Sequence, residues 1–529
     1  MAAPLRIALA QMNPVVGDIE GNLAKTKEML RAAADAGAAL VVFPELTLTG
    51  YPPEDLLLKR NFLARADAAL KDLAASVQGI TALVGWPEAA DGLLYNSAAV
   101  LTDRQIEAVY RKQLLPNYGV FDERRWFEPG SEPLVVDVDG AKVGIEICED
   151  MWEPEPTRCT AAAGAEVVVN LSASPYHFGK GREREQILCT LAREHGVHMA
   201  FCNLAGGQDE LVYDGHSLMI DPQGEVTARG PQFGEALVLE GQVAEPLERE
   251  EEVYRALVTG VHDYVRKNGF ERVVIASSGG IDSALTILVA VDALGPESVV
   301  TVTMPSRYSS EGTRSDARAI SENLAVELHE IPIEEAMAAY TELLADAFEG
   351  READLTEENL QARIRGNIVM ALSNKFGWLV LTTGNKSEMS VGYATLYGDM
   401  AGGFAVLKDV YKGWVYRLVR WRNEREGRNL VPASVLDRPP SAELRFEQRD
   451  DQSLPPYDVL DAILEGYIEG GEDAEQLVAR GLPEEDVRRV IRMVDLAEYK
   501  RRQAPPGVKI STKAFGRDRR LPITNRFRG

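Results

Sequence analysis

The 529-residue sequence contains few of the residues that build disulfide or metal scaffolds. It has only four cysteines and six histidines. The cysteines all lie in the first half and none forms a CxxC pair, and no HxxxH pair occurs. The scarcity and spacing of these residues argue against a disulfide framework and against a zinc site.

The sequence also lacks long apolar runs and an excess of positive charge. No segment approaches the ~20 apolar residues that span a bilayer, and residues 1–10 enter a strand-like run without separate signal-peptide regions. We therefore expect a cytoplasmic protein that does not enter a membrane. The formal net charge of −25 argues against nucleic acid as a partner.

The C-terminal segment departs from this acidic character. Residues 500–529 contain ten Lys or Arg residues and a single acid, Asp518. A solvated basic tail is the simplest interpretation, and a contact with nucleic acid is a weaker one. Contact with substrate phosphates or with an acidic neighbouring subunit fits the rest of the chain better.

The first half of the chain alternates short apolar runs with a few amphipathic stretches. A chain of 529 residues is too long for one core, so we expect two domains. Strand-like runs occupy residues 5–11, 40–45, 80–87, 96–101, 134–138, 142–148, 167–171, 198–204 and 216–220, and helix-like runs occupy 22–36 and 182–194. Many strands and few long helices predict a layered α/β sandwich for residues 1–245.

An acidic stretch, residues 245–252, is the best candidate for a surface linker. After it, helix-like and strand-like runs alternate regularly at residues 253–267, 273–276, 281–294, 298–304, 312–325 and 379–383. This alternation predicts a doubly wound parallel sheet in a second domain, residues 253–529. Residues 443–451 and 454–456 are predicted to form surface loops, and a helical segment at 458–500 precedes the basic tail.

One glycine-rich turn, which we call the phosphate loop, connects a strand-like run to a helix-like run. It consists of Ser277, Ser278, Gly279, Gly280, Ile281, Asp282 and Ser283. Exposed backbone N–H groups at such a turn, with glycines that admit close approach, form a pocket for phosphate. The pattern is neither a Walker loop nor a GxGxxG fingerprint. It resembles the loop of the ATP pyrophosphatases, which split ATP into AMP and pyrophosphate while activating a carboxylate or carbonyl.

Three reactive residues of the first half lie in or at the end of apolar runs. They are Glu45, Lys112 and Cys148. A thiol is only slightly ionised at neutral pH, so it needs a base such as Glu45 to become a nucleophile. An ammonium such as Lys112 can stabilise the oxyanion that forms when the thiolate attacks an amide. A Cys–His dyad is the rival interpretation, although His177, His195 and His198 lie in no recognisable protease signature.

Together these three residues resemble the Glu-Lys-Cys triad of the nitrilase/amidase family. The matching segments are FPEL, YRKQLLPNYGVFDERR and GIEICEDMW, in the same order. The resemblance implies an αββα sandwich over residues 1–245 that releases ammonia from glutamine. It also implies that Tyr118, Ser174 and Lys180 hold glutamine and that Glu123 is a supporting acid near the thiol.

The second half resembles the NAD synthetase family. The phosphate loop, ENLQARIR (358–365), TTGNKSE (382–388) and YGD (397–399) carry this resemblance. It implies an ATP-pyrophosphatase-type domain that adenylates the nicotinate carboxylate of deamido-NAD and then amidates it with ammonia from the first half. The expected small-molecule partners are therefore glutamine, ATP and deamido-NAD, in a homo-oligomer.

The same resemblance assigns residues in the second half. The phosphate loop, Thr383, Lys412 and Ser441 would bind ATP, and Asn359, Glu388 and Lys513 would bind deamido-NAD. Asp282 and Glu388 offer hard oxygen ligands for Mg²⁺. Smaller ammonia-using relatives often have Lys where this chain has Leu396, so substrate contacts at that turn differ.

Two other functions remain open from the sequence alone. One is an amidotransferase that activates a different carboxylate. The other is a non-catalytic regulatory homologue, which would be expected to lack Glu45, Lys112, Cys148 or Asp282. All four residues are present.

Overall fold

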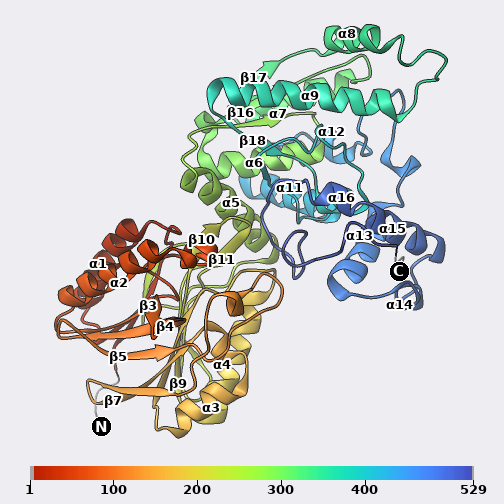
Figure 1. The fold of residues 1–529 in the computed structure, drawn as a ribbon. Coiled ribbons are helices and arrows are strands. Elements are labelled where there is room, and N and C mark those ends of the chain that lie inside the picture. Colours follow the sequence, from red (N-terminus) through yellow and green to blue (C-terminus); the bar gives the residue numbers. More distant parts are fainter. Residues whose placement is uncertain (1–4, 527–529) are drawn as a thin grey trace. The chain divides into compact units, whose positions relative to one another are not determined.

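A computed structural model describes residues 5–526 of the chain, which divides into two compact units, Met1–Glu248 and Arg249–Gly529 (Figure 1). Each unit has a sheet core covered by helices. Within residues 5–526, no helix is both long and apolar enough to cross a membrane.

Two six-stranded sheets form the centre of the first unit, with strand orders β14-β1-β2-β3-β4-β5 and β13-β12-β9-β8-β7-β6. The first comprises β1 (Ile7–Gln11), β2 (Leu40–Val42), β3 (Thr81–Ala90), β4 (Leu93–Thr102), β5 (Gln105–Arg111) and β14 (Ala236–Leu239). The second comprises β6 (Leu134–Val138), β7 (Ala141–Ile147), β8 (Val167–Ser172), β9 (His198–Asn203), β12 (Leu218–Ile220) and β13 (Val226–Arg229). A separate antiparallel pair joins β10 (Ala205–Gln208) to β11 (Leu211–Asp214).

The two sheets face each other across an apolar layer. Along β1, Leu9 points into this layer, whereas Ala8 and Ala10 point to the outer face, as the two-residue period of a strand requires. Ile145 on β7 and Val169 on β8 complete the same layer from the second sheet.

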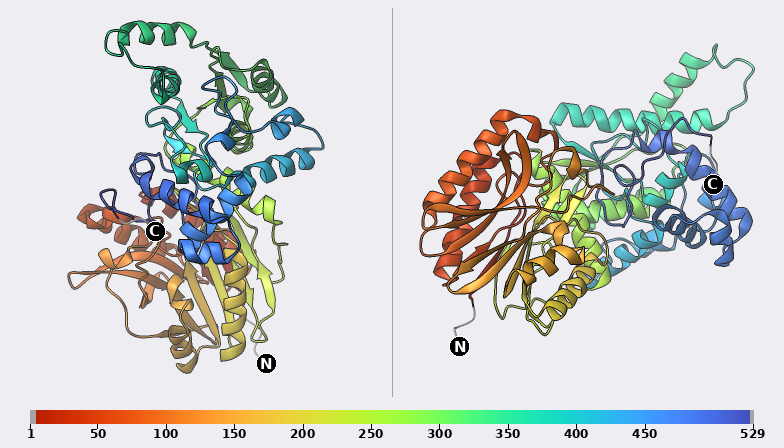
Figure 2. Two further views of the ribbon diagram at one scale, coloured as in Figure 1. Left: turned by 90° about the vertical axis from the view of Figure 1, so that its right-hand side faces the viewer. Right: turned by 60° about the horizontal axis from the view of Figure 1, so that its bottom comes forward.

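Helices cover the outer faces of both sheets. The helices of the first unit are α1 (Ile19–Asp35), α2 (Arg60–Ser76), α3 (Pro154–Ala162) and α4 (Lys180–His195). The first two pack on the first sheet and the last two on the second (Figures 1 and 2). The predicted αββα sandwich is therefore confirmed.

One five-stranded parallel sheet forms the centre of the second unit. Its order is β17-β16-β15-β18-β19, and its strands are β15 (Val273–Ala276), β16 (Val299–Thr303), β17 (Glu327–Glu330), β18 (Leu379–Thr382) and β19 (Phe404–Ala405). From β15 the chain adds β16 and β17 on one side. It then returns and adds β18 and β19 on the other side of β15. The predicted doubly wound sheet is thus confirmed, and its switch point lies between β15 and β18, where such sheets bind ligands.

Helices cover this sheet on both faces. The larger helices are α5 (Arg249–Lys267), α6 (Ile281–Leu294), α7 (Glu311–Asn323), α8 (Glu334–Leu344), α9 (Leu355–Phe376) and α11 (Lys412–Glu426). Helix α9 packs on β15 and β18, while α6 packs against α5 and α11. Shorter helices follow as α10 (Lys386–Val391), α12 (Ala433–Asp437), α13 (Tyr457–Leu464), α14 (Ala474–Ala479), α15 (Glu484–Leu496) and α16 (Glu498–Arg501).

The expected linker at residues 245–252 is partly wrong. Helix α5 begins at Arg249, and Glu252 is buried. Three glutamates occupy its first turn, where negative charge is favourable. Arg417 and Arg425 of α11 pair with two of these acids, Glu250 and Glu251. Residues 249–252, the second half of the acidic run, are therefore part of a packed helix.

The basic C-terminal segment is not a solvated tail over its described part. Arg501 and Lys509 are buried, and Lys509 pairs with Asp518 at 3.0 Å. Asp409 accepts hydrogen bonds from the backbone N–H groups of Ile510 and Ser511. Much of the positive charge of this segment is thus neutralised within the second unit.

The expected surface loops at 443–451 and 454–456 are also partly wrong. Gln448, Asp450 and Leu454 are buried. Asp450 begins a short 3₁₀ turn (Asp450–Gln452). Its carboxylate accepts a hydrogen bond from Tyr457 at 2.9 Å, which ties the segment to α13.

Candidate active sites

Glu45 lies just beyond β2. The strand ends at Val42, three residues earlier than predicted, because Pro44 has no N–H to donate to a ladder. The Glu45 carboxylate is fully buried. Its Oε1 accepts hydrogen bonds from Lys112 Nζ and Asn96 Nδ2, both at 2.7 Å. Its Oε2 accepts one from the backbone N–H of Ala173 at 3.0 Å.

Lys112 lies directly after β5 and connects two carboxylates. Its Nζ is 2.7 Å from Glu45 Oε1 and 2.9 Å from each carboxylate oxygen of Glu123. Burial disfavours the charged ammonium, but the charges of Glu123 and Glu45 outweigh this and raise the pKa of Lys112 well above its usual value. Lys112 therefore stays protonated and can stabilise negative charge.

Glu123 completes this buried cluster, as the nitrilase resemblance implied. Burial raises the pKa of Glu123 to about 7, against the opposing charge of Lys112. The Tyr51 hydroxyl donates a hydrogen bond to its Oε1 at 2.7 Å.

Cys148 follows β7 in a strained backbone conformation. The strand ends at Ile147, and Cys148 begins a 3₁₀ turn (Cys148–Met151) with φ of 44°. Left-handed backbone at a residue other than glycine is uncommon and concentrates at functional sites. The side chain of Asn170 on β8 holds the backbone of Cys148 through two hydrogen bonds. Asn170 Oδ1 accepts from Cys148 N at 3.1 Å, and Asn170 Nδ2 donates to Cys148 O at 3.4 Å.

The Cys148 thiol is neutral at rest. Burial, followed by the charge of Glu45, raises the pKa of the thiol well above its usual value, and Lys112 opposes this only in part. A base must therefore take its proton before it can attack a carbonyl. The charges acting most strongly on the thiol belong to Glu45, Lys112, Glu149 and Glu123. This environment supports the Glu-Lys-Cys interpretation.

The three residues predicted to hold glutamine surround this cluster. The Tyr118 hydroxyl donates to Glu149 Oε1 at 2.8 Å. Ser174 is buried in the loop after β8, where its backbone N–H donates to Asn203 Oδ1 at 2.9 Å. Lys180 begins α4, with its Nζ 3.6 Å from the ring centroid of Trp152. The Cys148 charge acts on both Tyr118 and Lys180, so these side chains lie in the electrostatic field of the thiol.

Glu146, an acid of the GIEICEDMW segment, is buried on β7 two residues before Cys148. Its Oε2 accepts from Thr157 Oγ1 at 3.1 Å. Burial, and then the charge of Asp150, raise the pKa of Glu146 from 4.5 to about 8. Glu146 is therefore neutral in the folded protein at neutral pH.

This burial predicts a pH-dependent stability. Between pH 4.5 and about 8 the folded state keeps a proton on Glu146 that the unfolded state has lost, so stability falls as pH rises through this window. Glu146→Gln should raise the free energy of unfolding of the first unit by up to about 3 kcal/mol at pH 7 and by less than about 1 kcal/mol at pH 5. Urea unfolding at the two pH values measures this difference.

The exposed Glu194 on α4 provides the matched control. Glu194→Gln should change the stability equally little at both pH values. An equal effect of Glu146→Gln at pH 5 and pH 7 would contradict the account of Glu146.

In the second unit, a cavity of about 620 Å³ lies at the carboxyl ends of β15, β16 and β18. The phosphate loop forms its floor between β15 and α6. Gly279 has φ of 78° and packs so closely on α7 that a Cβ would lie 2.1 Å from Thr313 O. Only glycine fits this position, which explains one of the two glycines of the motif.

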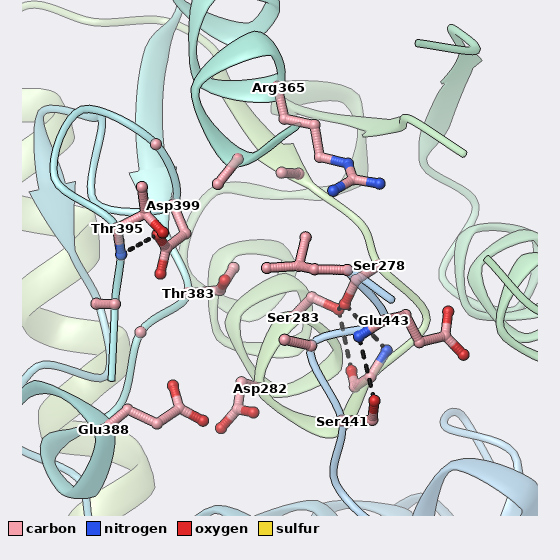
Figure 3. A pocket seen from close by; sticks show the side chains of 18 of the residues that line it. Ser278, Asp282, Ser283, Arg365, Thr383, Glu388, Thr395, Asp399, Ser441 and Glu443 are labelled. Atoms are coloured by element: carbon pink, nitrogen blue, oxygen red, sulfur yellow. Dashed lines mark hydrogen bonds between the residues drawn. The ribbon is translucent and has the colours of Figure 1, made fainter. Parts of the chain in front are cut away.

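Asp282, like Glu388, lines this cavity (Figure 3). Asn385 Nδ2 donates to its Oδ1 at 2.8 Å, and Lys412 Nζ donates to its Oδ2. Lys412 also donates to Glu388 Oε1 at 3.2 Å, so one ammonium joins the two carboxylates. Burial raises the pKa of Glu388 to about 8, against the opposing charge of Lys412.

Most of the other residues predicted for this site line the same cavity. They are Thr383, Ser441 and Asn359. Ser441 Oγ donates to the backbone oxygen of Gln448 at 2.6 Å, and Asn359 Oδ1 accepts from Thr395 Oγ1 at 2.8 Å. Lys513 does not line the cavity, and its backbone oxygen accepts from Lys386 Nζ at 3.1 Å.

Three asparagines that the sequence motifs did not single out hold the predicted residues in place. Asn96 on β4 binds Glu45, Asn170 on β8 binds Cys148, and Asn385 binds Asp282. An asparagine inside or after an apolar strand was the one available signal, because a buried amide requires a hydrogen-bonding partner.

Comparison with known proteins identifies both units. A carbon–nitrogen hydrolase family model matches residues 6–245, and an NAD synthase family model matches residues 253–504. The two folds and sites therefore define an enzyme that joins an amide-hydrolysing unit to an NAD synthase unit.

Full-length relatives make the assignment specific. The glutamine-dependent NAD(+) synthetase of Thermotoga maritima is 50% identical, with 99% of each chain covered, and that of Xylella fastidiosa strain 9a5c is 48% identical, with 100% of each covered. The solved structure of the Acinetobacter baumannii enzyme, in complex with ADP, is 42% identical, with a TM-score of 0.81 and 98% of each chain covered. The chain belongs to the family of glutamine-dependent NAD(+) synthetases.

Proposed function

We propose that the chain amidates deamido-NAD to NAD with ammonia that it releases from glutamine, consuming ATP to AMP and pyrophosphate. The observation that supports this most is the pairing of two intact sites in one chain. The first holds Cys148 beside buried Glu45 and Lys112, and the second holds Asp282 in a phosphate loop at the end of a parallel sheet.

In the first site, the thiol attacks the side-chain amide of glutamine. Glu45 accepts the thiol proton and later returns it to the departing nitrogen, so that ammonia leaves and a thioester remains on Cys148. Water then hydrolyses the thioester to glutamate. Lys112, held between Glu45 and Glu123, stabilises the oxyanion formed in each step. Tyr118, Ser174 and Lys180 are proposed to hold glutamine.

In the second site, the nicotinate carboxylate of deamido-NAD attacks the α-phosphorus of ATP and pyrophosphate leaves. The resulting acyl adenylate is a good electrophile, whereas a carboxylate at neutral pH is a poor one. Ammonia displaces AMP and forms the carboxamide of NAD. The phosphate loop, Thr383, Lys412 and Ser441 are proposed to bind ATP, and Asn359, Glu388 and Lys513 to bind deamido-NAD.

Asp282 and Glu388 are the residues that would hold Mg²⁺. Among residues 5–526 there is no cluster of three or more metal-ligating side chains, but Mg²⁺ bound to phosphates needs only one or two carboxylates. Lys412 Nζ contacts both carboxylates, so the two lie within reach of a single cation. The ion would neutralise developing charge on the phosphate oxygens.

A product assay tests the proposed reaction. Protein supplied with ATP, Mg²⁺, glutamine and deamido-NAD should form NAD, AMP, pyrophosphate and glutamate in equal amounts. Formation of ADP in place of AMP would contradict adenylation. AMP formation with another carboxylate, but not with deamido-NAD, would favour an amidotransferase of different specificity.

A substitution at Lys180 tests the glutamine site. Lys180→Met should raise the KM for glutamine by about 10-fold or more, because it removes one charged hydrogen bond to the substrate. NAD formation from ammonium should be unchanged. The exposed Lys142 provides the control, since Lys142→Met removes the same charge from the surface. An unchanged glutamine KM in Lys180→Met would exclude Lys180 from the site.

We also propose a homo-oligomer without nucleic-acid or membrane partners. The acidic net charge of −25 supports the absence of a nucleic-acid partner. The cytoplasmic location expected from the sequence remains a prediction.

A further inference from the structure

Two arginines that neither the motifs nor the resemblance singled out line the cavity of the second unit. Arg314 lies in the first turn of α7, and Arg365 lies in the middle of α9. Figure 3 shows Arg365 across the cavity from Glu388 and Asp282. Both guanidinium groups therefore approach the cavity from elements other than the phosphate loop.

Few groups of the protein offset the positive charge of Arg365. Its Nε donates to Met304 O at 3.1 Å, and no carboxylate within residues 5–526 forms an ion pair with it. Burial lowers the pKa of Arg365 to about 10, and Glu443 opposes this by its charge alone. The group therefore remains cationic at neutral pH, with Nη1 and Nη2 available to a ligand.

Arg314 is similarly placed. Its Nη2 donates to Ser306 O at 3.1 Å, and its buried Nε has no hydrogen-bond partner among residues 5–526. The neighbouring Thr313 is the residue against which Gly279 of the phosphate loop packs. Arg314 is therefore adjacent to the phosphate loop in space. It is also hydrogen bonded to the segment that follows β16.

The other cations of the cavity are already neutralised or hydrogen bonded. Lys412 pairs with Asp282 and Glu388, and Arg438 pairs with Asp316. Lys500 donates to two backbone oxygens at 2.7 Å each. Arg314 and Arg365 thus differ from Lys412 and Arg438 in forming no ion pair with a carboxylate within residues 5–526.

Arg365 and Arg314 bind the backbone oxygens of Met304 and Ser306, which are only two residues apart. The two positive charges therefore repel each other in a partly buried site. A polyanion between them would remove the repulsion and satisfy the remaining N–H donors. Guanidinium groups match phosphate geometry with two parallel hydrogen bonds. The position of Arg314 beside the phosphate loop selects the phosphate chain of ATP over the diphosphate of the dinucleotide.

We propose that Arg314 and Arg365 bind the phosphate chain of ATP and complete the site that the phosphate loop begins. This inference rests on the proposed function and adds two residues to its ATP site. The positive charge at one side of the cavity and the carboxylates of Asp282 and Glu388 at the other would orient the nucleotide between them.

The test measures NAD formation from ammonium at saturating deamido-NAD with full-length protein. Arg314→Met and Arg365→Met should each raise the KM for ATP by about 10-fold or more and weaken inhibition by inorganic pyrophosphate in parallel. Replacing either arginine by lysine should raise the KM for ATP less, because lysine keeps the positive charge although it lacks the planar guanidinium group. The KM for deamido-NAD and the glutaminase activity should stay within about two-fold.

Arg318→Met provides the matched control. Arg318 lies one turn beyond Arg314 on α7, where it pairs at the surface with Glu330, so this variant should keep the ATP KM of the unchanged protein. An unchanged ATP KM in both methionine variants would overturn the inference, as would a raised ATP KM with undiminished pyrophosphate inhibition. If the unchanged protein forms no NAD from ammonium and ATP, the proposed function fails instead.

Discussion

Replacing Cys148 by alanine is expected to abolish NAD formation from glutamine and to spare NAD formation from ammonium. Cys148 is the proposed nucleophile that forms the thioester, so glutamine-dependent synthesis should fall by about 10⁴-fold or more. The ammonium reaction uses only the second site, which has its own sheet and cavity. The rates of NAD formation from glutamine and from ammonium, measured on one preparation of the variant, test whether the two sites work separately.

The half-exposed Cys159 on α3 supplies the control for this variant. Cys159→Ala should support both reactions, which would assign the loss in Cys148→Ala to the nucleophile rather than to the removal of a sulfur atom. Loss of the ammonium reaction in Cys148→Ala would contradict the division of labour between the two sites. Retained glutamine use would remove Cys148 from the mechanism.

Replacing Asp282 by asparagine is expected to abolish NAD formation from both nitrogen sources. The substitution keeps the shape of the side chain but removes the charge that faces Lys412 and would hold Mg²⁺. Loss of several kcal/mol of transition-state stabilisation corresponds to a decrease of about 10³-fold or more. Steady-state rates with glutamine and with ammonium check the prediction.

Asp292 on the same helix provides the comparison for Asp282. It pairs with Arg422 and receives a hydrogen bond from Tyr254 at 2.7 Å, and it does not line the cavity. Asp292→Asn should therefore keep both synthetic activities. Asp282→Asn should still hydrolyse glutamine, because Cys148 lies in the other unit. Undiminished synthesis in Asp282→Asn would refute its metal-binding role.

The fold class and the family follow from the sequence because the signals are local. The phosphate loop needs a strand, two glycines and a helix within a few residues, and Glu45, Lys112 and Cys148 each lie close to the end of a strand. Where the chain bends sharply, the predicted ends were off by a few residues. Pro44 ends β2 early, and the left-handed backbone of Cys148 ends β7.

The remaining contacts could not be predicted because they join residues far apart in the chain. Asn96 is 51 residues from Glu45, Asn385 is 103 residues from Asp282, and Lys412 is 130 residues from it. Only the folded sheet brings such residues together. The acidic run at 245–252 was expected to be a surface linker, and the basic C-terminal segment was expected to contact substrate phosphates or a neighbouring subunit. Their partners within the second unit lie far away in the sequence.

The transfer of nitrogen from glutamine to NAD is the central claim. Protein supplied with glutamine labelled with ¹⁵N at the side-chain amide, together with ATP, Mg²⁺ and deamido-NAD, should yield NAD whose carboxamide carries ¹⁵N. Mass spectrometry should find one labelled NAD for each AMP and each glutamate. NAD without the label, or glutamate formed without NAD or AMP, would contradict the account.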